Sequence, residues 1–200
     1  MKNGVFITVD GPNGVGKSSF IDALSKKLSS SFPMHLTREP SPTQFGDFVK
    51  RYEHHLSGVS YAQLIWSDRY FHLANFVLPE LKSGKVVISD RYIESSFVLQ
   101  GFDGVPIDKI WELNKDFIIP DISIILLAAP TLLEERLSQR DYLTNFEKRM
   151  TRDQEVYAYR KAVDFLSDKG FRFLVCENNT MEDLDRNISE VYDKICSLMR

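Results

Sequence analysis

The segment FITVDGPNGVGKSSF, residues 6–20, constrains the fold of this chain more than any other part of the sequence. An apolar run ends at Asp10, and Gly11 to Ser18 then match the pattern G-x-x-x-x-G-K-[ST]. In this pattern a glycine-rich backbone turns its N–H groups inward around phosphate oxygens. Amphipathic spacing begins directly afterwards, so the loop connects a buried strand to the positively polarised N-terminus of a helix. The segment therefore predicts a triphosphate site, with ATP as the expected ligand.

The same loop predicts how the nucleotide is held. We expect Lys17 to reach the β- and γ-phosphates and the Ser18 hydroxyl to ligate Mg²⁺, which prefers oxygen ligands. The alternative is a glycine-rich turn without a ligand, which the flanking strand and helix make the weaker interpretation. The residues expected to bind the nucleotide are Gly11, Pro12, Asn13, Gly14, Val15, Gly16, Lys17, Ser18 and Ser19.

Short apolar segments alternate with helical patterns along the rest of the chain. Strands are predicted at 5–9, 34–37, 86–89, 122–127 and 171–175. Helices are predicted at 18–30, 60–82, 108–117, 130–139 and 181–199, and one more follows residue 152 and ends at about residue 168. This alternation predicts a P-loop NTPase-type three-layer α/β/α fold, in which a five-stranded parallel sheet carries helices on both faces. Because linkers and repeats are lacking, we expect residues 1–200 to form a single kinase-type domain, with the phosphate loop at 11–18.

Composition and charge limit the remaining classes of function. A net charge of −3 argues against a general nucleic-acid binder. The two cysteines, Cys176 and Cys196, cannot form a disulfide framework, so we expect reduced thiols. The N-terminus lacks the layout of a signal peptide, and no segment approaches the ~20 apolar residues of a membrane span. We therefore expect a cytoplasmic protein that acts on small molecules and binds neither nucleic acid nor membranes.

A second polar cluster follows the predicted strand at 86–89, where the sequence reads SDRYIESSFVLQG over residues 89–101. Since ligands bind at the carboxyl ends of the strands, Asp90 and Arg91 should lie beside the phosphate loop. Arg91 could bridge donor and acceptor phosphates, and Asp90 could hold Arg91 or a metal-bound water. Asp10 is expected to support Mg²⁺ or Arg91. The alternatives are an ordinary surface salt bridge for the Asp90–Arg91 pair and a loop cap for Asp10.

Taken in order, the motifs of this chain resemble those of the thymidylate kinase family. The motifs are DGPNGVGKSS, TREP at 37–40, SDRY at 67–70, SDRYIESSFVLQG, and PDISIILLAAPTLLEERLSQR at 120–140. The resemblance implies a nucleoside monophosphate kinase that transfers the γ-phosphoryl of ATP to a pyrimidine deoxynucleoside monophosphate, with dTMP as the favoured acceptor. It further implies dependence on Mg²⁺ and a homodimer packed through the long helix at 60–82.

The resemblance also assigns roles around the acceptor. It implies that Arg38 and Lys50 bind the acceptor phosphate, that Pro40 lies under the base, and that Arg91 bridges the two phosphates. The contacts implied on the edge of the base are those of Arg69, Ser96 and Gln100. The expected substrate-binding residues are therefore Asp10, Asn13, Arg38, Pro40, Lys50, Ile65, Trp66, Arg69, Arg91, Ser96, Leu99 and Gln100.

Residues 140–152 resemble the lid that closes on ATP. The phosphate loop has no basic residue at its variable positions, so the lid should supply an arginine near the transferred phosphoryl. Arg140 and Arg149 are the first candidates and Arg152 is the third, although each could equally be a solvated surface charge. The expected catalytic residues are Lys17, Asp90, Arg91, Arg140 and Arg149, and the expected metal ligands are Ser18 and Asp90.

Several positions depart from the family pattern, mostly around the acceptor. Asn13 stands where the family usually has a carboxylate that contacts the sugar 3'-hydroxyl, and Leu99 replaces a tyrosine that crowds the 2' position. The stacking phenylalanine of the family falls on Ile65, and the neighbouring Trp66 could substitute for it. We expect weaker discrimination between deoxyribose and ribose.

Two alternative functions remain open at this point. One is a deoxynucleoside kinase, whose hydroxyl acceptor benefits from a carboxylate base, for which Glu39 is the candidate. Arg38 and Lys50 argue against it, because they would then have no acceptor phosphate to bind. The other alternative is a thymidylate-kinase-like nucleotide-binding protein with an altered acceptor or no turnover.

Overall fold

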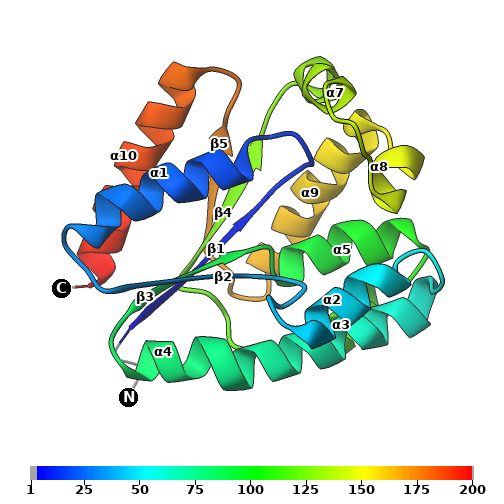
Figure 1. Ribbon diagram of the computed structural model, residues 1–200, viewed down its shortest axis with the longest axis horizontal. Coiled ribbons are helices and arrows are strands. Elements are labelled where there is room, and N and C mark those ends of the chain that lie inside the picture. The colour runs from blue at the N-terminus through cyan, green and yellow to red at the C-terminus, as the bar shows by residue number, and fades with distance from the viewer. Residues whose placement is uncertain (1–3, 200) are drawn as a thin grey trace.

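A five-stranded, all-parallel sheet lies at the centre of the computed structural model, which describes residues 4–199 (Figure 1). Its strands are β1 (Val5–Asp10), β2 (Met34–Arg38), β3 (Val86–Asp90), β4 (Ile122–Leu127) and β5 (Phe173–Glu177), in the spatial order β2-β3-β1-β4-β5. The predicted α/β fold is confirmed. The last strand begins two residues later than the apolar pattern indicated.

Helices cover both faces of this sheet. Along the chain they are α1 (Lys17–Ser29), α2 (Gln44–Tyr52), α3 (Gly58–His72), η1 (Leu73–Val77), α4 (Leu78–Lys82), α5 (Ile93–Phe102), α6 (Ile107–Asn114), α7 (Pro130–Ser138), α8 (Asn145–Arg149), α9 (Arg152–Ser167) and α10 (Met181–Leu198). Figure 1 shows α1 and α10 on one side of the sheet and α3, α4 and α5 on the other. Successive residues of β1 point to opposite faces of the sheet. Ile7 packs in the core that includes residues of α1 and α10, and Phe6 packs in the core that includes residues of α4 and α5.

The long helix predicted at 60–82 forms as three consecutive segments, α3, η1 and α4. In a continuous α-helix the ring of Pro79 would clash with the carbonyl of Asn75, four residues earlier. The π-helical segment η1 widens the backbone ladder just before this point, and the N–H of Leu78 reaches back five residues to the carbonyl of Leu73. The helix therefore continues through the proline.

Three helices were not anticipated from the sequence. In α5, seven of ten residues are buried, so the segment lacks the apolar stripe that marks a surface helix. Helix α2 is short and contains Gly46, although the Thr43 hydroxyl caps its N-terminus by accepting from the Gly46 N–H. Helix α8, in the predicted lid, has only five residues. Among residues 4–199, none of the helices is long and apolar enough to cross a membrane.

The strand register brings the polar strand ends together. Arg38 pairs with Asp90, and Asp90 pairs with Val9, the residue before Asp10. Gly11 then passes so close to β4 that an added Cβ would lie 2.2 Å from the carbonyl oxygen of Leu126, and its φ is +145°. Only glycine accepts both constraints, which is why the loop can begin at this strand end.

Gly46 provides a direct test of backbone packing. A Cβ at this position would lie 1.9 Å from the carbonyl oxygen of Ser41, whereas at Gly101 the nearest atom is the Ile110 Cδ1 at 3.9 Å. We predict that Gly46→Ala lowers the free energy of unfolding by about 3 kcal/mol or more, because one backbone must shift. Gly101→Ala, inside α5, should raise the free energy of unfolding by about 1 kcal/mol or less. Urea unfolding measures both, and equal stabilities would contradict the prediction.

Candidate active site

The phosphate loop is held closed by its own lysine. The Lys17 Nζ donates to the carbonyl oxygens of Gly11 at 2.7 Å and Pro12 at 3.1 Å. Burial, together with the nearby charge of Arg91, lowers the pKa of Lys17 to about 8. The side chain lies at a cavity with Asn13, Gly14, Gly16, Ser18 and Ser19, as predicted for a nucleotide site. Of the residues expected to bind the nucleotide, Gly11, Pro12 and Val15 do not line this cavity.

Arg136, which the sequence did not single out, supports the loop from α7. Its Nη1 donates to the carbonyl oxygens of Gly14 at 3.3 Å and Val15 at 3.4 Å, and the Asn178 amide donates to the same Val15 oxygen at 2.8 Å. The carbonyl oxygens of Gly14 and Val15 are therefore occupied by these donors. Arg136 also lines the cavity with Arg140 and thus adds positive charge to it.

Asp10 is a buried junction at the end of β1. Its Oδ1 accepts hydrogen bonds from the N–H of Gly11 at 2.9 Å, from Ser95 Oγ at 2.9 Å, from Tyr159 Oη at 2.7 Å and from Arg91 Nη1 at 3.3 Å. Because Asp10 is 0% exposed, the grouping of this residue with the substrate contacts is wrong. The structure instead gives it one of its two expected roles, which is to hold Arg91.

Arg91 lies between two cavities. Its backbone adopts φ +72°, a left-handed conformation that is uncommon for residues other than glycine, and its N–H is fixed to the carbonyl oxygen of Val9 at 2.9 Å. The side chain lines both the phosphate-loop cavity and a second cavity of about 240 Å³ that opens beside it. Arg91 is therefore shared by both cavities, as are Asn13 and Asp90.

Asp90 also lines both cavities, and its Oδ1 is buried without a hydrogen-bond partner among the described residues. Asp90 was expected to hold either Arg91 or a metal-bound water. Within residues 4–199, no hydrogen bond joins it to the Arg91 side chain, so the structure does not supply the first of these partners. An orphaned carboxylate oxygen at the same cavity as Ser18, an exposed residue, matches the oxygen donors that Mg²⁺ prefers. The donor set therefore fits the metal that the sequence implied.

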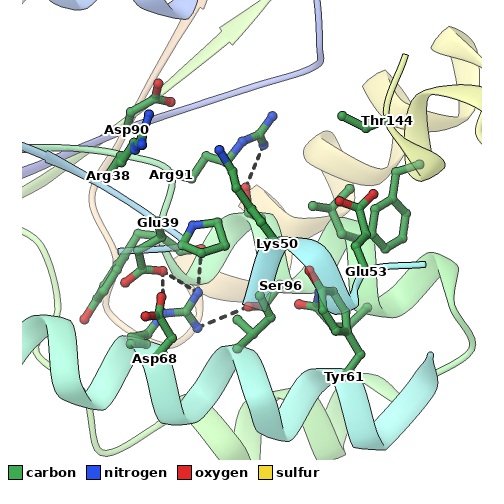
Figure 2. A pocket seen from close by; sticks show the side chains of 18 of the residues that line it. Arg38, Glu39, Lys50, Glu53, Tyr61, Asp68, Asp90, Arg91, Ser96 and Thr144 are labelled. Atoms are coloured by element: carbon green, nitrogen blue, oxygen red, sulfur yellow. Dashed lines mark hydrogen bonds and ion pairs between the residues drawn. The ribbon is translucent and has the colours of Figure 1, made fainter. Parts of the chain in front are cut away.

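The second cavity collects most of the residues expected to bind the acceptor (Figure 2). The expected residues that line it are Asn13, Arg38, Pro40, Lys50, Ile65, Arg69, Arg91, Ser96, Leu99 and Gln100. Figure 2 shows Arg38, Asp90 and Arg91 at one end and Glu53, Tyr61 and Thr144 at the other, with Lys50 between them. The cations thus gather at the end next to the phosphate loop.

Trp66 does not line this cavity. It is 36% exposed and packs against the rings of Tyr70 and Phe117 on the outside of the long helix, so its predicted role as a stacking substitute is wrong. The aromatic residues that do line the cavity are Tyr61, Tyr92 and Phe146. Helix geometry decides this, because neighbouring residues on a helix point about 100° apart.

Arg69 lines the cavity, and most of its N–H groups have protein acceptors. Its Nε and Nη2 lie 2.8 and 2.7 Å from Glu39 Oε2, and Nη2 also donates to the carbonyl oxygen of Tyr92 at 3.0 Å. The Nη1 donates to Ser96 Oγ at 3.1 Å and to Asn114 Oδ1. A guanidinium has five N–H groups. Four of those of Arg69 have hydrogen-bond acceptors in the protein, and Nη2 is also within ion-pair distance of Glu39. The expected direct hydrogen bond from Arg69 to the base stays a prediction.

Comparison with known proteins agrees with this geometry. A family model described as thymidylate kinase matches residues 9–188. The chain belongs to the thymidylate kinase family. A probable thymidylate kinase of Caldivirga maquilingensis is 37% identical over 78% of this chain and 80% of its own length. Thymidylate kinases of Staphylococcus epidermidis and Caldicellulosiruptor saccharolyticus are 30% and 32% identical, each over at least 96% of both chains.

Membership of the thymidylate kinase family confirms the resemblance seen in the sequence and makes this chain a nucleotide kinase, which is a phosphotransferase. The contacts of single residues in this member come from its own structure. Gln100 is 3% exposed, lines the acceptor cavity, and has its Oε1 without a partner among the described residues. A buried amide oxygen left in this way is ready for a ligand donor. Ser96, which accepts from Arg69, keeps its own hydroxyl proton to donate.

The segment that was predicted to form a lid, residues 140–152, contains α8. Arg140 pairs with Glu147 at 3.0 Å and lines the phosphate-loop cavity, as predicted for a lid arginine. Arg149 instead pairs with Asp103 at 2.8 Å, at the end of α5, and does not line that cavity. Arg152 is 4% exposed and bound to Glu155, so it is not a solvated charge. Of the three candidates, only Arg140 lines the phosphate-loop cavity.

The Arg69–Glu39 pair gives a test of structural against direct roles. We predict that Arg69→Met lowers the free energy of unfolding by about 3–5 kcal/mol, because Glu39 is left buried without its cation. Arg160 is a matched control, since it pairs with Glu177 at 3.2 Å on the surface. Arg160→Met should cost about 1 kcal/mol or less. If Arg69→Met melted like the native chain and lost only nucleotide affinity, Arg69 would be a ligand contact and not a structural one.

Proposed function

We propose that this chain transfers the γ-phosphoryl of ATP to dTMP in the presence of Mg²⁺ and releases dTDP and ADP. One observation carries the proposal. The guanidinium of Arg91 lines both the phosphate-loop cavity and the acceptor cavity, so a single cation can contact the two phosphates between which the phosphoryl group moves. The names of the relatives support dTMP as the acceptor.

The residues at the junction suit transfer between two anions. A nucleoside monophosphate is largely ionised at pH 7, since its second pKa is about 6, so its oxygen attacks without a strong base. Lys17, Arg91 and Arg140 are placed to neutralise the phosphates and to align them. Ser18 and Asp90 would hold Mg²⁺, which supplies further neutralisation of the donor phosphates when it is bound.

The acceptor cavity suits a pyrimidine monophosphate. Arg38 and Lys50 lie toward Arg91 and can bind its phosphate. At the other end, Ser96 offers a hydroxyl donor and Gln100 an unpaired acceptor, while Ile65 supplies an apolar surface. A site with buried polar groups of this kind rejects ligands that leave them unpaired.

Glu39 argues against the alternative of a deoxynucleoside kinase. Burial alone would raise its pKa, but the guanidinium of Arg69 and a hydrogen bond from His72 outweigh burial and hold the pKa below the ordinary value. A carboxylate held by Arg69 in this way is a poor proton acceptor.

The wider expectations complete the proposal. We place residues 1–200 in a single domain and the protein in the cytoplasm, acting on nucleotides and not on nucleic acid or membranes. We further propose a homodimer packed through the long helix at 60–82. Its outer face carries Trp66, Tyr70, Phe71 and Leu78, which are between 36% and 62% exposed in the single chain.

Lys17 tests the donor site. We predict that Lys17→Ala lowers the rate of ADP release with dTMP by about 100-fold or more, because a cation on the transferred phosphoryl is lost. Lys26→Ala is the control, since Lys26 pairs with Asp22 on the exposed face of α1. Circular dichroism and thermal melting check that both variants fold. Near-native turnover in a folded Lys17→Ala variant would refute the kinase mechanism proposed here.

The acceptor class is tested by comparing dTMP with thymidine. We predict that the native chain turns over dTMP faster than thymidine and faster than purine monophosphates. Lys50→Ala should raise the KM for dTMP about 10- to 100-fold, as expected for a lost charged hydrogen bond of about 1.5–3 kcal/mol. Lys115, which pairs with Glu112 on the surface, provides the control variant Lys115→Ala. Faster turnover of thymidine than of dTMP would instead establish a nucleoside kinase.

A further inference from the structure

The position of the Arg91 guanidinium is set by four side chains. Its Nη1 donates to Asp10 at 3.3 Å, to Ser95 at 2.9 Å and to the Tyr159 hydroxyl at 3.2 Å. Its Nη2 donates to the Asn13 Oδ1 at 2.8 Å. The contact with Asn13 differs from the others, because a carboxamide has an oxygen on one side and a nitrogen on the other, and only the oxygen can accept.

Glu155 determines which way the Asn13 amide points. The Glu155 Oε1 accepts from the Asn13 Nδ2 at 3.1 Å and from the Asn13 backbone N–H at 3.0 Å. A carboxylate only accepts hydrogen bonds, so it keeps the NH₂ of the amide on its own side. If the amide turned over, its NH₂ would face the Arg91 N–H and its oxygen would face the carboxylate. Glu155 therefore keeps the Asn13 oxygen directed at Arg91.

Glu155 itself cannot reach a substrate. It is 1% exposed and lines neither the phosphate-loop cavity nor the acceptor cavity. Its Oε2 binds the Arg152 Nη1 at 2.6 Å, and the Arg152 Nη2 donates to the carbonyl oxygens of Glu147 and Met150, which belong to the lid. A continuous chain of contacts thus runs from the base of the lid through Glu155 and Asn13 to Arg91.

We propose that Glu155 is a positioning residue for phosphoryl transfer, which acts by fixing the Asn13 carboxamide so that its carbonyl holds Arg91 between the two cavities. The inference rests on the function proposed above. It also makes positions 13 and 155 interdependent. An aspartate at position 13 is disfavoured while Glu155 is present, because its carboxylate would lie within hydrogen-bond distance of the buried carboxylate of Glu155.

Exchange of the charge between the two positions tests the pair. We expect Glu155→Gln to lower kcat with dTMP at least tenfold while the KM values for ATP and dTMP stay within threefold. Asn13→Asp should lower kcat with dTMP by a larger factor than Glu155→Gln. The double variant Asn13→Asp/Glu155→Gln should regain at least tenfold over Asn13→Asp, because the new amide at 155 can donate to the new carboxylate at 13. Glu134→Gln is the matched control, since Glu134 is also 3.8 Å from Arg152 but its side chain is 76% exposed.

A readout without turnover separates this inference from the proposed function. In ¹⁵N-labelled protein, the Arg91 Nε–H and Asn13 side-chain amide signals should shift or broaden in Glu155→Gln and stay in place in Glu134→Gln. If the native chain phosphorylates no nucleotide, the proposed function fails, and these signals still decide the role of Glu155.

Three results would overturn the inference. The first is a Glu155→Gln variant with native kcat and unmoved Arg91 and Asn13 signals. The second is a double variant that is no faster than Asn13→Asp, since a merely structural role of Glu155 predicts additive losses. The third applies if Glu155→Gln alone does not fold. In that case, a melting temperature of the double variant below that of Asn13→Asp would overturn the inference.

Discussion

The hydrogen bonds to one buried carboxylate oxygen, that of Asp10, hold the site together. The four donors come from the phosphate loop, from the residue after β3, from α5 and from α9. A buried carboxylate is costly unless it is hydrogen-bonded, so these elements are stable only when they converge on it. The central position of β1 in the sheet makes that convergence possible, because its end lies between β3 and β4. The loop and the bridging arginine thereby share one anchor.

The acceptor cavity separates groups that build the site from groups left available to a ligand. Arg69 and Glu39 are both charged, both buried and both at the cavity, yet they satisfy each other. Gln100 is neutral and equally buried, and its Oε1 has no partner among the described residues. The polar groups available to a ligand are therefore those without a partner in the protein, such as the Gln100 Oε1. The charge of a residue alone does not identify a ligand contact.

Most of the fold follows from the sequence pattern, and β4 forms over the very residues, 122–127, that its apolar run indicated. Parallel strands buried on both faces are easy to see, because they are almost continuously apolar. Helix α5 is hard to see for the same reason, since a helix buried on most sides loses its period. Trp66 was misplaced because a one-residue difference on a helix changes the direction of the side chain.

The placement of the phosphate loop, Arg91 and the acceptor residues was also within reach of the sequence, because a motif and the strand ends define them. The partners of these residues were not. Glu155 lies 142 positions from Asn13, and the acceptors around Arg69 come from three separate segments. No local pattern relates such residues, since only the packing of helices on the sheet brings them together. Sequence therefore identified the functional groups better than it identified what orients them.

The contacts of Lys17 with the carbonyl oxygens of its own loop have a consequence for selectivity. An incoming phosphate displaces an internal ligand and not only water, so the measured affinity is the difference between two sets of contacts. A ligand with a single phosphate offers few oxygens with which to replace the two carbonyls and to engage the loop N–H groups at the same time. A chain of phosphates can do both. We therefore expect the contacts of Lys17 with its own loop to favour polyphosphates over inorganic phosphate.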